Sequence, residues 1–206
     1  MGRVHAYIDG FNLYYAIKRW KGLKWLDVRA FAREFLDPAD ALGHVYYFTA
    51  MVHPTPRDPD KAKRQAVYVN ALKSLSNVTV VMGNYAIVRR TCRVCGKRYA
   101  VYEEKTTDVS IGLRMLQDAL EDRCEHLMLI SADGDQAGTL KTIHGLGRHL
   151  LTVVLPPRTS NKEFARFARH GLCRIKRGSK RHVARSQLPD PVRHGALILH
   201  RPIAWT

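Results

Sequence analysis

Short apolar runs alternate along this chain with longer stretches in which apolar residues recur every three or four positions. The short runs, rich in β-branched and aromatic residues, predict strands at residues 4–8, 44–51, 77–88, 126–130 and 149–155, with a short final strand at 172–175. The amphipathic stretches predict helices at residues 11–20, 26–35, 61–75, 135–145 and 162–170. Because strands and helices alternate, the sequence predicts βαβ units and a three-layer α/β fold around a mostly parallel sheet.

One more helix is predicted to begin at Thr106 or Thr107. Its apolar stripe is formed by four residues at helical spacing: Val109, Leu113, Leu116 and Leu120. Asp108 falls in the first turn, where the helix dipole favours an anion. Asp27 is a plausible N-cap of the helix at 26–35.

Residues 1–175 form one predicted domain, and two segments depart from its alternation of strands and helices. Residues 89–103 predict an inserted hairpin that carries two cysteines. Residues 176–206 are basic and proline-bearing, and we expect an extended tail that packs on the domain rather than a second domain. The basic part of the tail, residues 176–185, could alternatively serve as a flexible nucleic-acid arm.

The charge of the chain favours a polyanion as its partner. The 206 residues include 34 Lys and Arg against 18 Asp and Glu, a net charge of +16. An excess of this size favours nucleic acid through counterion release, although a merely soluble basic protein is the alternative. No apolar stretch approaches the roughly 20 residues that span a bilayer, so we expect no membrane association. The N-terminus has no apolar signal segment, so we expect a cytoplasmic protein.

Two of the four cysteines have the spacing of a metal knuckle. Cys92 and Cys95 form a CxxC-Gly motif, which is half of a tetrahedral Zn²⁺ site. No second CxxC exists, so a hairpin turn or an eroded metal site is the alternative to zinc. A homo-oligomer could complete the half site, and the oligomeric state is otherwise open. Cys124 and Cys173 stand alone in apolar contexts, as small core residues do.

Four carboxylates are predicted to meet at one end of the sheet. Asp9 ends the first strand, Asp133 and Asp135 follow the fourth, and Asp108 opens the helix that leads into the fourth. In a doubly wound order such as 3-2-1-4-5, the first and fourth strands are neighbours at the switch point where ligands bind. So much negative charge in a cleft is costly unless hard cations neutralise it. Mg²⁺ suits such a site and can activate water toward a phosphodiester.

Three segments together resemble the NYN domain family (LabA-like), part of the PIN-like nuclease superfamily. They are Tyr7–Leu13 (YIDGFNL), Glu104–Val109 (EKTTDV) and Leu129–Asp135 (LISADGD), which occur in the family's order. The resemblance covers roughly residues 3–175 and implies a PIN-like, Rossmann-like α/β fold. Ala132 stands where the family often has glycine, and Gln136 where an aromatic residue is common.

The resemblance implies a ribonuclease that uses Mg²⁺ or Mn²⁺. Asp9, Asp108 and Asp133 would be the main metal carboxylates, with Asp135 supporting them. Asn12 would orient Asp9 or contact a phosphate. Ser131 would hydrogen-bond within the site, and Lys105 would meet the scissile phosphate.

The leading hypothesis is an endoribonuclease that prefers single-stranded RNA, and the runner-up is a non-catalytic RNA-binding module on the same fold. All four acidic positions are present, which favours the enzyme. A Rossmann-type nucleotide-binding enzyme fits less well because the first strand ends in Asp-Gly-Phe-Asn rather than a glycine-rich loop. A phosphatase with Asp9 as nucleophile lacks a second carboxylate two residues on. Four aromatic residues could stack on bases or belong to the core: Tyr14, Tyr15, Trp20 and Trp25.

Overall fold

The computed structural model describes residues 2–104 and 106–206, apart from the side chains of 85–87 and 100–104. Within this part of the chain, the central sheet consists of β1 (Arg3–Asp9), β2 (Ala41–Thr49), β3 (Val78–Met82), β6 (His126–Ile130), β7 (Leu150–Leu155) and β8 (Arg174–Arg177). The order is β3-β2-β1-β6-β7-β8, and every neighbouring pair runs parallel. The predicted mostly parallel sheet is confirmed, including the pairing of the first strand with the strand at 126–130.

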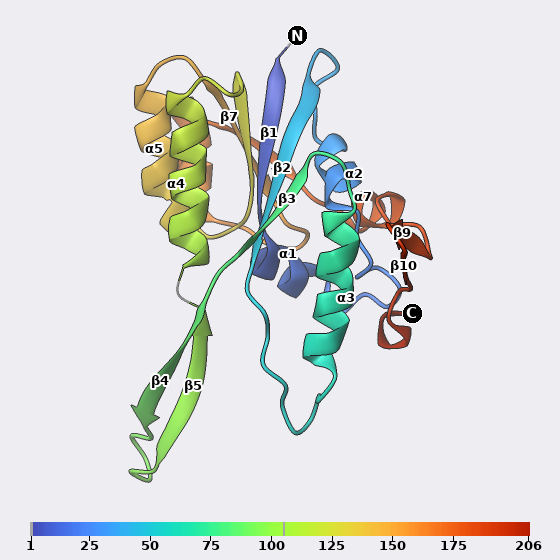
Figure 1. Ribbon diagram of the computed structural model, residues 1–206. Helices are drawn as coiled ribbons and strands as arrows, with labels where there is room; N and C mark the ends of the chain where they lie inside the picture. Colours follow the sequence, from blue (N-terminus) through green and yellow to red (C-terminus); the bar gives the residue numbers. More distant parts are fainter. Residues whose placement is uncertain (1, 105) are drawn as a thin grey trace.

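Helices cover both faces of the sheet and make the predicted three layers (Figure 1). One face carries α1 (Gly10–Ile17), α2 (Val28–Arg33), α3 (Lys61–Lys73) and α7 (Lys180–Arg185), and their apolar residues share one core cluster. The other face carries α4 (Thr107–Leu120), α5 (Ala137–Gly145) and α6 (Lys162–Arg169), which form a second cluster. All five residues of β6 are buried because both faces of a parallel sheet are covered. Asp27 caps α2 as predicted, accepting from the backbone N–H groups of Arg29 and Ala30.

The apolar stripe that identified α4 is not the face that the helix buries. Val109, Leu113 and Leu120 are 62%, 64% and 55% exposed. The buried face instead carries Ile111, Met115, Asp118 and Ala119. A buried aspartate interrupts this second stripe, so hydrophobic periodicity favours the wrong face. The helix can bury Asp118 because neighbouring side chains satisfy its charge.

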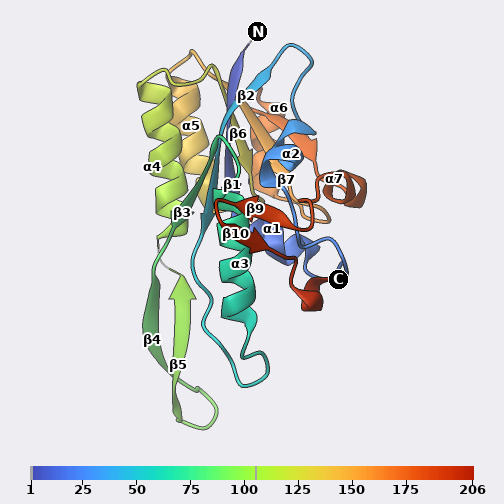
Figure 2. The ribbon, with the colours of Figure 1, turned by 45° about the vertical axis from the view of Figure 1, so that its right-hand side comes forward.

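The cysteine-bearing insertion is an antiparallel hairpin of β4 (Tyr85–Thr91) and β5 (Arg98–Glu104). It starts earlier than residue 89, and the predicted strand at 77–88 divides into β3 and the first part of β4. Both ribbon views show the hairpin projecting from the body below α4 (Figures 1 and 2).

The tail after residue 176 packs on the body and contains more regular structure than predicted. It forms α7, a small hairpin of β9 (Val192–His194) and β10 (Leu197–Leu199), and a final turn, η2 (Ile203–Trp205). Trp205 is buried against Trp25 and Tyr68, at ring-centroid distances of 6.4 and 5.6 Å. Residues 176–185, considered above as an alternative nucleic-acid arm, end β8 and form α7. The remaining element is the short turn η1 (Gly134–Gln136). Among the described residues, every helix is too short or too polar to span a bilayer.

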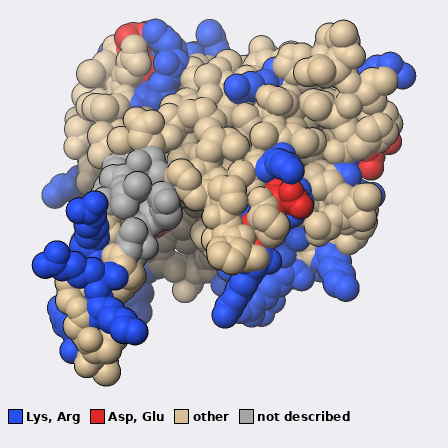
Figure 3. All heavy atoms as spheres, turned by 60° about the horizontal axis from the view of Figure 1, so that its bottom comes forward, with Lys and Arg blue, Asp and Glu red and all other residues tan. Residues whose placement is uncertain are grey.

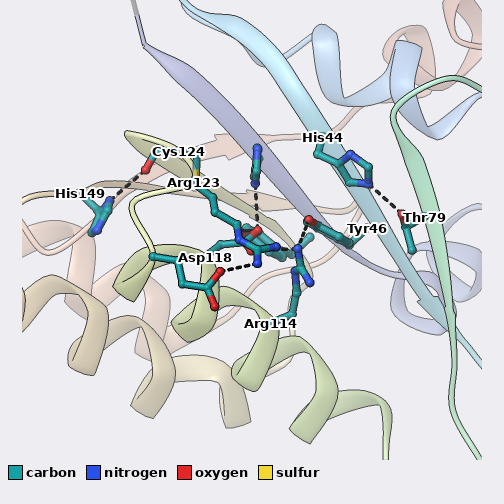
Figure 4. A network of polar contacts seen from close by, with 11 residues as sticks. His44, Tyr46, Thr79, Arg114, Asp118, Arg123, Cys124 and His149 are labelled. Carbon is teal, nitrogen blue, oxygen red and sulfur yellow. Dashed lines mark hydrogen bonds and ion pairs between the residues drawn. The ribbon is translucent and has the colours of Figure 1, made fainter.

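A buried polar network fastens α4 to the sheet (Figure 4). Asp118, which is fully buried, accepts a hydrogen bond from the Tyr7 hydroxyl at 2.8 Å and lies 2.9 Å from Nδ1 of His5. Its other oxygen pairs with Arg114 at 3.0 Å, and Arg114 also donates to the Tyr46 hydroxyl. Burial by itself raises the pKa of Asp118, but these partners outweigh it and hold the pKa below its usual value. The carboxylate is therefore charged in the folded protein at neutral pH.

We predict that Asp118→Asn lowers the free energy of unfolding by on the order of 3 kcal/mol at about pH 7, because buried donors lose their charged acceptor. The folded-state pKa lies below the unfolded value, so this stability is present above the unfolded pKa and is lost as pH falls through the folded pKa. Urea unfolding should therefore show a constant difference from about pH 7 to 5 that shrinks below about pH 4. Asp122→Asn, on the exposed turn that follows α4, should behave as wild type; an equal loss in both variants would contradict the account.

Candidate metal centre

Asp9 is held in place at the junction of β1 and α1. It is the N-cap of α1, and its Oδ1 accepts a hydrogen bond from the backbone N–H of Asn12 at 2.9 Å. The next residue, Gly10, lies so close to β2 that an added Cβ would stand 2.6 Å from the carbonyl oxygen of Phe48. The chain therefore needs glycine immediately after Asp9, and the close packing holds the backbone against β2 at this point.

Hydrogen bonds connect the end of β1 to the end of β6. Ile8 pairs with Ile130, so Asp9 and Ser131 leave the sheet side by side. The buried hydroxyl of Ser131 donates to Oδ2 of Asp9 at 3.1 Å and accepts from the backbone N–H of Asp133 at 3.0 Å. The side chain of Asn12 accepts from the N–H of Ala132 at 3.0 Å. These bonds set the position of Asp133 relative to Asp9.

Asp108 approaches the same point from the first turn of α4. Its backbone carbonyl accepts a hydrogen bond at 3.0 Å from the side chain of Gln136, a buried residue at the end of η1. The start of α4 is thus tied to the loop that carries Asp133. The buried contacts of Asp118 fasten the far end of the same helix.

Three carboxylates from three segments converge. One oxygen from each of Asp9, Asp108 and Asp133 lies within 4.8 Å of the others. At this spacing three negative charges repel strongly unless a cation lies among them. The donor set suits a hard divalent cation such as Mg²⁺ or Mn²⁺, because it is all oxygen. Asp9 is buried whereas Asp133 is partly exposed, which leaves room for water or substrate oxygen on the open side.

The other residues expected at the site lie around this group. Asp135 is exposed and is not part of the three-carboxylate cluster; its backbone N–H donates to Oδ1 of Asp133 at 3.1 Å. Asn12 and Ser131 make the contacts to Asp9 given above. Lys105 lies outside the described residues.

The carboxylates lie in a cleft of about 560 Å³ with a basic rim. Lys18 and Arg19 reach it from the end of α1, and Arg158 reaches it from the loop after β7. Figure 3, in which the lower end of Figure 1 faces the reader, shows Lys and Arg over the hairpin and along the body, with Asp and Glu confined to small areas. The sequence interpretation missed the loop after β7, although β7 neighbours β6 and its carboxyl end must face the same cleft.

A second cavity of about 270 Å³ adjoins the first and has aromatic walls. Phe11, Tyr15 and Lys18 line both cavities, while Tyr14 and Trp205 line only the second. The ammonium group of Lys18 lies 4.3 Å from the ring centroid of Tyr15. Of the four aromatic candidates, Tyr14 and Tyr15 are exposed at this cavity. Trp25 is buried in the core, and Trp20 is partly buried and packs against the core.

The model of the NYN domain family matches residues 3–172. The chain belongs to the NYN domain family. This is a PIN-like, nuclease-type family, and the acidic cluster of this NYN domain falls on the three segments that carry the resemblance.

Two known proteins are similar to this NYN domain. The 6-hydroxy-3-succinoylpyridine 3-monooxygenase HspA of Pseudomonas putida (strain DSM 28022 / S16) is 27% identical, and the match covers 98% of this chain and 75% of that protein. The crystal structure of VPA0982, a protein of unknown function from Vibrio parahaemolyticus RIMD 2210633, matches with a TM-score of 0.56 and 16% identity, over 87% of this chain and 94% of that one. The similarity to the Vibrio protein shows only that the two chains share a fold.

We predict that metal binding reverses the effect of Asp133→Asn on thermal stability. Without metal the variant should melt at or above the wild-type temperature, because one of three repelling charges is gone. With Mn²⁺ at about 100 times its dissociation constant, wild type should gain about 2.7 kcal/mol and overtake the variant. Thermal unfolding with Mn²⁺ and with EDTA measures both states.

The control for this measurement is Asp60→Asn, which removes an exposed carboxylate at the start of α3. It should shift with Mn²⁺ as wild type does. A wild-type protein that gains no stability from Mn²⁺ or Mg²⁺ would contradict a metal centre at this cluster.

Proposed function

We propose that this NYN domain is a divalent-metal-dependent endoribonuclease that hydrolyses the phosphodiester bonds of RNA. The observation that carries the proposal is the convergence of Asp9, Asp108 and Asp133 in a cleft with a basic rim. Cation binding among the carboxylates supplies the chemistry, and basic side chains supply affinity for the phosphate backbone. The net charge of +16 points to the same class of substrate.

The residues of the cleft divide into ligands and residues that position them. Asp9, Asp108 and Asp133 would hold Mg²⁺ or Mn²⁺, which when bound activates water and stabilises the leaving oxygen. Ser131 and the backbone of Asn12 keep both oxygens of Asp9 oriented. The backbone N–H of Asp135 orients Asp133 in the same way, so Asp135 supports the site without joining the three carboxylates.

The rim of the cleft would bind the substrate. Lys18, Arg19 and Arg158 line the cleft, where they would contact phosphates next to the scissile bond. The resemblance to the family gives Lys105 the contact with the scissile phosphate, and that role stays a prediction.

The aromatic cavity supports a preference for single strands. Tyr14 and Tyr15 are exposed beside the acidic cluster, where unpaired bases can stack on their rings. Bases within a duplex are already stacked and cannot enter such a cavity. We therefore propose unpaired RNA as the substrate, and a cytoplasmic location stays a prediction.

The alternative is an RNA-binding module without catalysis. Such a module would keep the basic rim, but three carboxylates facing phosphates would weaken binding. The name of the Pseudomonas relative raises another reaction, oxygenation of a hydroxypyridine, for a protein with 27% identity to this one. Both alternatives give distinct results in one set of assays.

The test is cleavage of labelled single-stranded RNA, duplex RNA and matched single-stranded DNA, with Mg²⁺, Mn²⁺ or EDTA. We expect cleavage of single-stranded RNA that needs the metal and falls at least about 100-fold in Asp9→Asn, since the ligand set loses a charge. Asp60→Asn is the control and should keep wild-type rates. A parallel reaction in air contains 6-hydroxy-3-succinoylpyridine and a two-electron donor such as NADH in place of RNA, because a monooxygenase needs both O₂ and a reductant.

Intact RNA in every condition, together with tight binding that weakens with salt, would replace the nuclease with the binding module. Conversion of the pyridine compound while RNA stays intact would contradict the nuclease in favour of the relative's reaction. Cleavage that survives undiminished in Asp9→Asn would mean that the acidic cluster is not the catalytic centre.

A further inference from the structure

The tip of the β4–β5 hairpin brings two free cysteines into one tight turn. The backbone N–H of Cys92 donates to the carbonyl of Lys97, and the N–H of Gly96 donates to the carbonyl of Cys92, both at 2.9 Å. Gly96 has a φ of +69°, a left-handed conformation that glycine adopts without strain. The turn thus places Cys95 back beside Cys92, with neither in a disulfide.

Backbone groups of the turn stabilise the thiolate form of one cysteine. The N–H groups of Cys95 and Val94 lower the pKa of Cys92, and the thiol of Cys95 lowers it further. The two remaining cysteines are buried, and burial raises their pKa, to about 11 for Cys124. Cys92 and Cys95 are accessible to a soft cation at the hairpin tip, whereas the two buried core cysteines are not.

One chain supplies only half of the ligands. Zn²⁺ in structural sites takes four ligands in tetrahedral geometry, and two cysteines with CxxC spacing provide two of them. Among the described residues, the group of three or more potential ligands is the acidic one, which contains neither cysteine. The described residues thus offer the tip two ligands, and a second chain is the source we consider for the other two.

The surroundings of the tip suit a second copy of the same chain. The hairpin projects from the body in both ribbon views, so two tips can approach without contact between the bodies (Figures 1 and 2). Val94 lies between the cysteines and is 96% exposed, an apolar side chain that a tip-to-tip contact would cover. Two copies would supply the four thiolates that one zinc ion needs.

Charge complements this arrangement. Within residues 89–98 each hairpin carries five basic residues, Arg89, Arg90, Arg93, Lys97 and Arg98, which would repel those of another tip. A zinc ion with four thiolates has a net charge of about −2, and this negative centre would lie among the basic side chains of both hairpins. The metal centre thus offsets part of the repulsion between the two tips.

We propose that two copies of this chain join at their hairpin tips, where Cys92 and Cys95 of each copy bind one shared Zn²⁺ ion. The zinc centre is structural and separate from the acidic cluster. It makes a metal-dependent dimer with two clefts, and it does not rest on the proposed ribonuclease activity.

Metal content and mass of the full-length protein test the proposal. Purified without chelator, wild type should contain one zinc per two chains and have the mass of a dimer by light scattering. A strong chelator should release the zinc and give monomers, and added Zn²⁺ should restore the dimer. Co²⁺ in place of zinc should give the intense visible absorption of a tetrahedral thiolate site.

Matched variants separate the hairpin from the rest of the chain. Cys92→Ser with Cys95→Ser should be monomeric and lack the Co²⁺ absorption, while its thermal unfolding without metal stays that of wild-type monomer. Cys173→Ala should keep the metal and the dimer. Asp9→Asn should keep both as well, which separates this site from the acidic cluster.

Three results would overturn the proposal. Zinc bound at one ion per chain in a monomer would mean that one chain completes the site. A wild-type protein that binds no Zn²⁺ through thiolates, or a disulfide between Cys92 and Cys95 in the protein purified under reducing conditions, would remove the metal role. None of these results bears on RNA cleavage, so the two proposals fail separately.

Discussion

Mutual repulsion among Asp9, Asp108 and Asp133 is the constraint around which the carboxyl end of the sheet is built. Three carboxylates within 4.8 Å oppose folding unless the scaffold holds them and a cation neutralises them. The scaffold is the buried β1–β6 pair, whose register brings Asp9 next to Ser131. The Ser131 hydroxyl then donates to one oxygen of Asp9 and accepts from the backbone N–H of Asp133, so one residue positions two of the three aspartates.

The third carboxylate depends on a network at the other end of α4. Asp108 and Asp118 lie on the same helix, and Asp118 is fixed by His5 and Tyr7 of β1. Asp9 ends the same strand. The buried charge of Asp118 and the acidic cluster thus depend on the same helix and the same strand. We expect a disturbance of the Asp118 network to displace Asp108 from the acidic cluster.

The sequence is sufficient to predict the sheet and the meeting of three of the four expected carboxylates, Asp135 being the exception, for a physical reason. Parallel strands buried on both faces leave continuous apolar runs such as 126–130, and their carboxyl ends must share an edge. The buried face of α4 was not predictable from periodicity, because Asp118 breaks its apolar pattern and its partners on β1 lie more than a hundred residues away. Arg158 and the aromatic wall from Trp205 depend on tertiary packing in the same way.

The central claim is that the three carboxylates bind a divalent cation. Crystals of the wild-type protein soaked in Mn²⁺ test it directly, because anomalous scattering identifies and locates the metal. The account predicts an anomalous peak with ligand oxygens from Asp9, Asp108 and Asp133, at the short distances typical of a hard cation. A saturating soak that leaves no peak among these carboxylates, or places manganese only at other surface carboxylates, would contradict it.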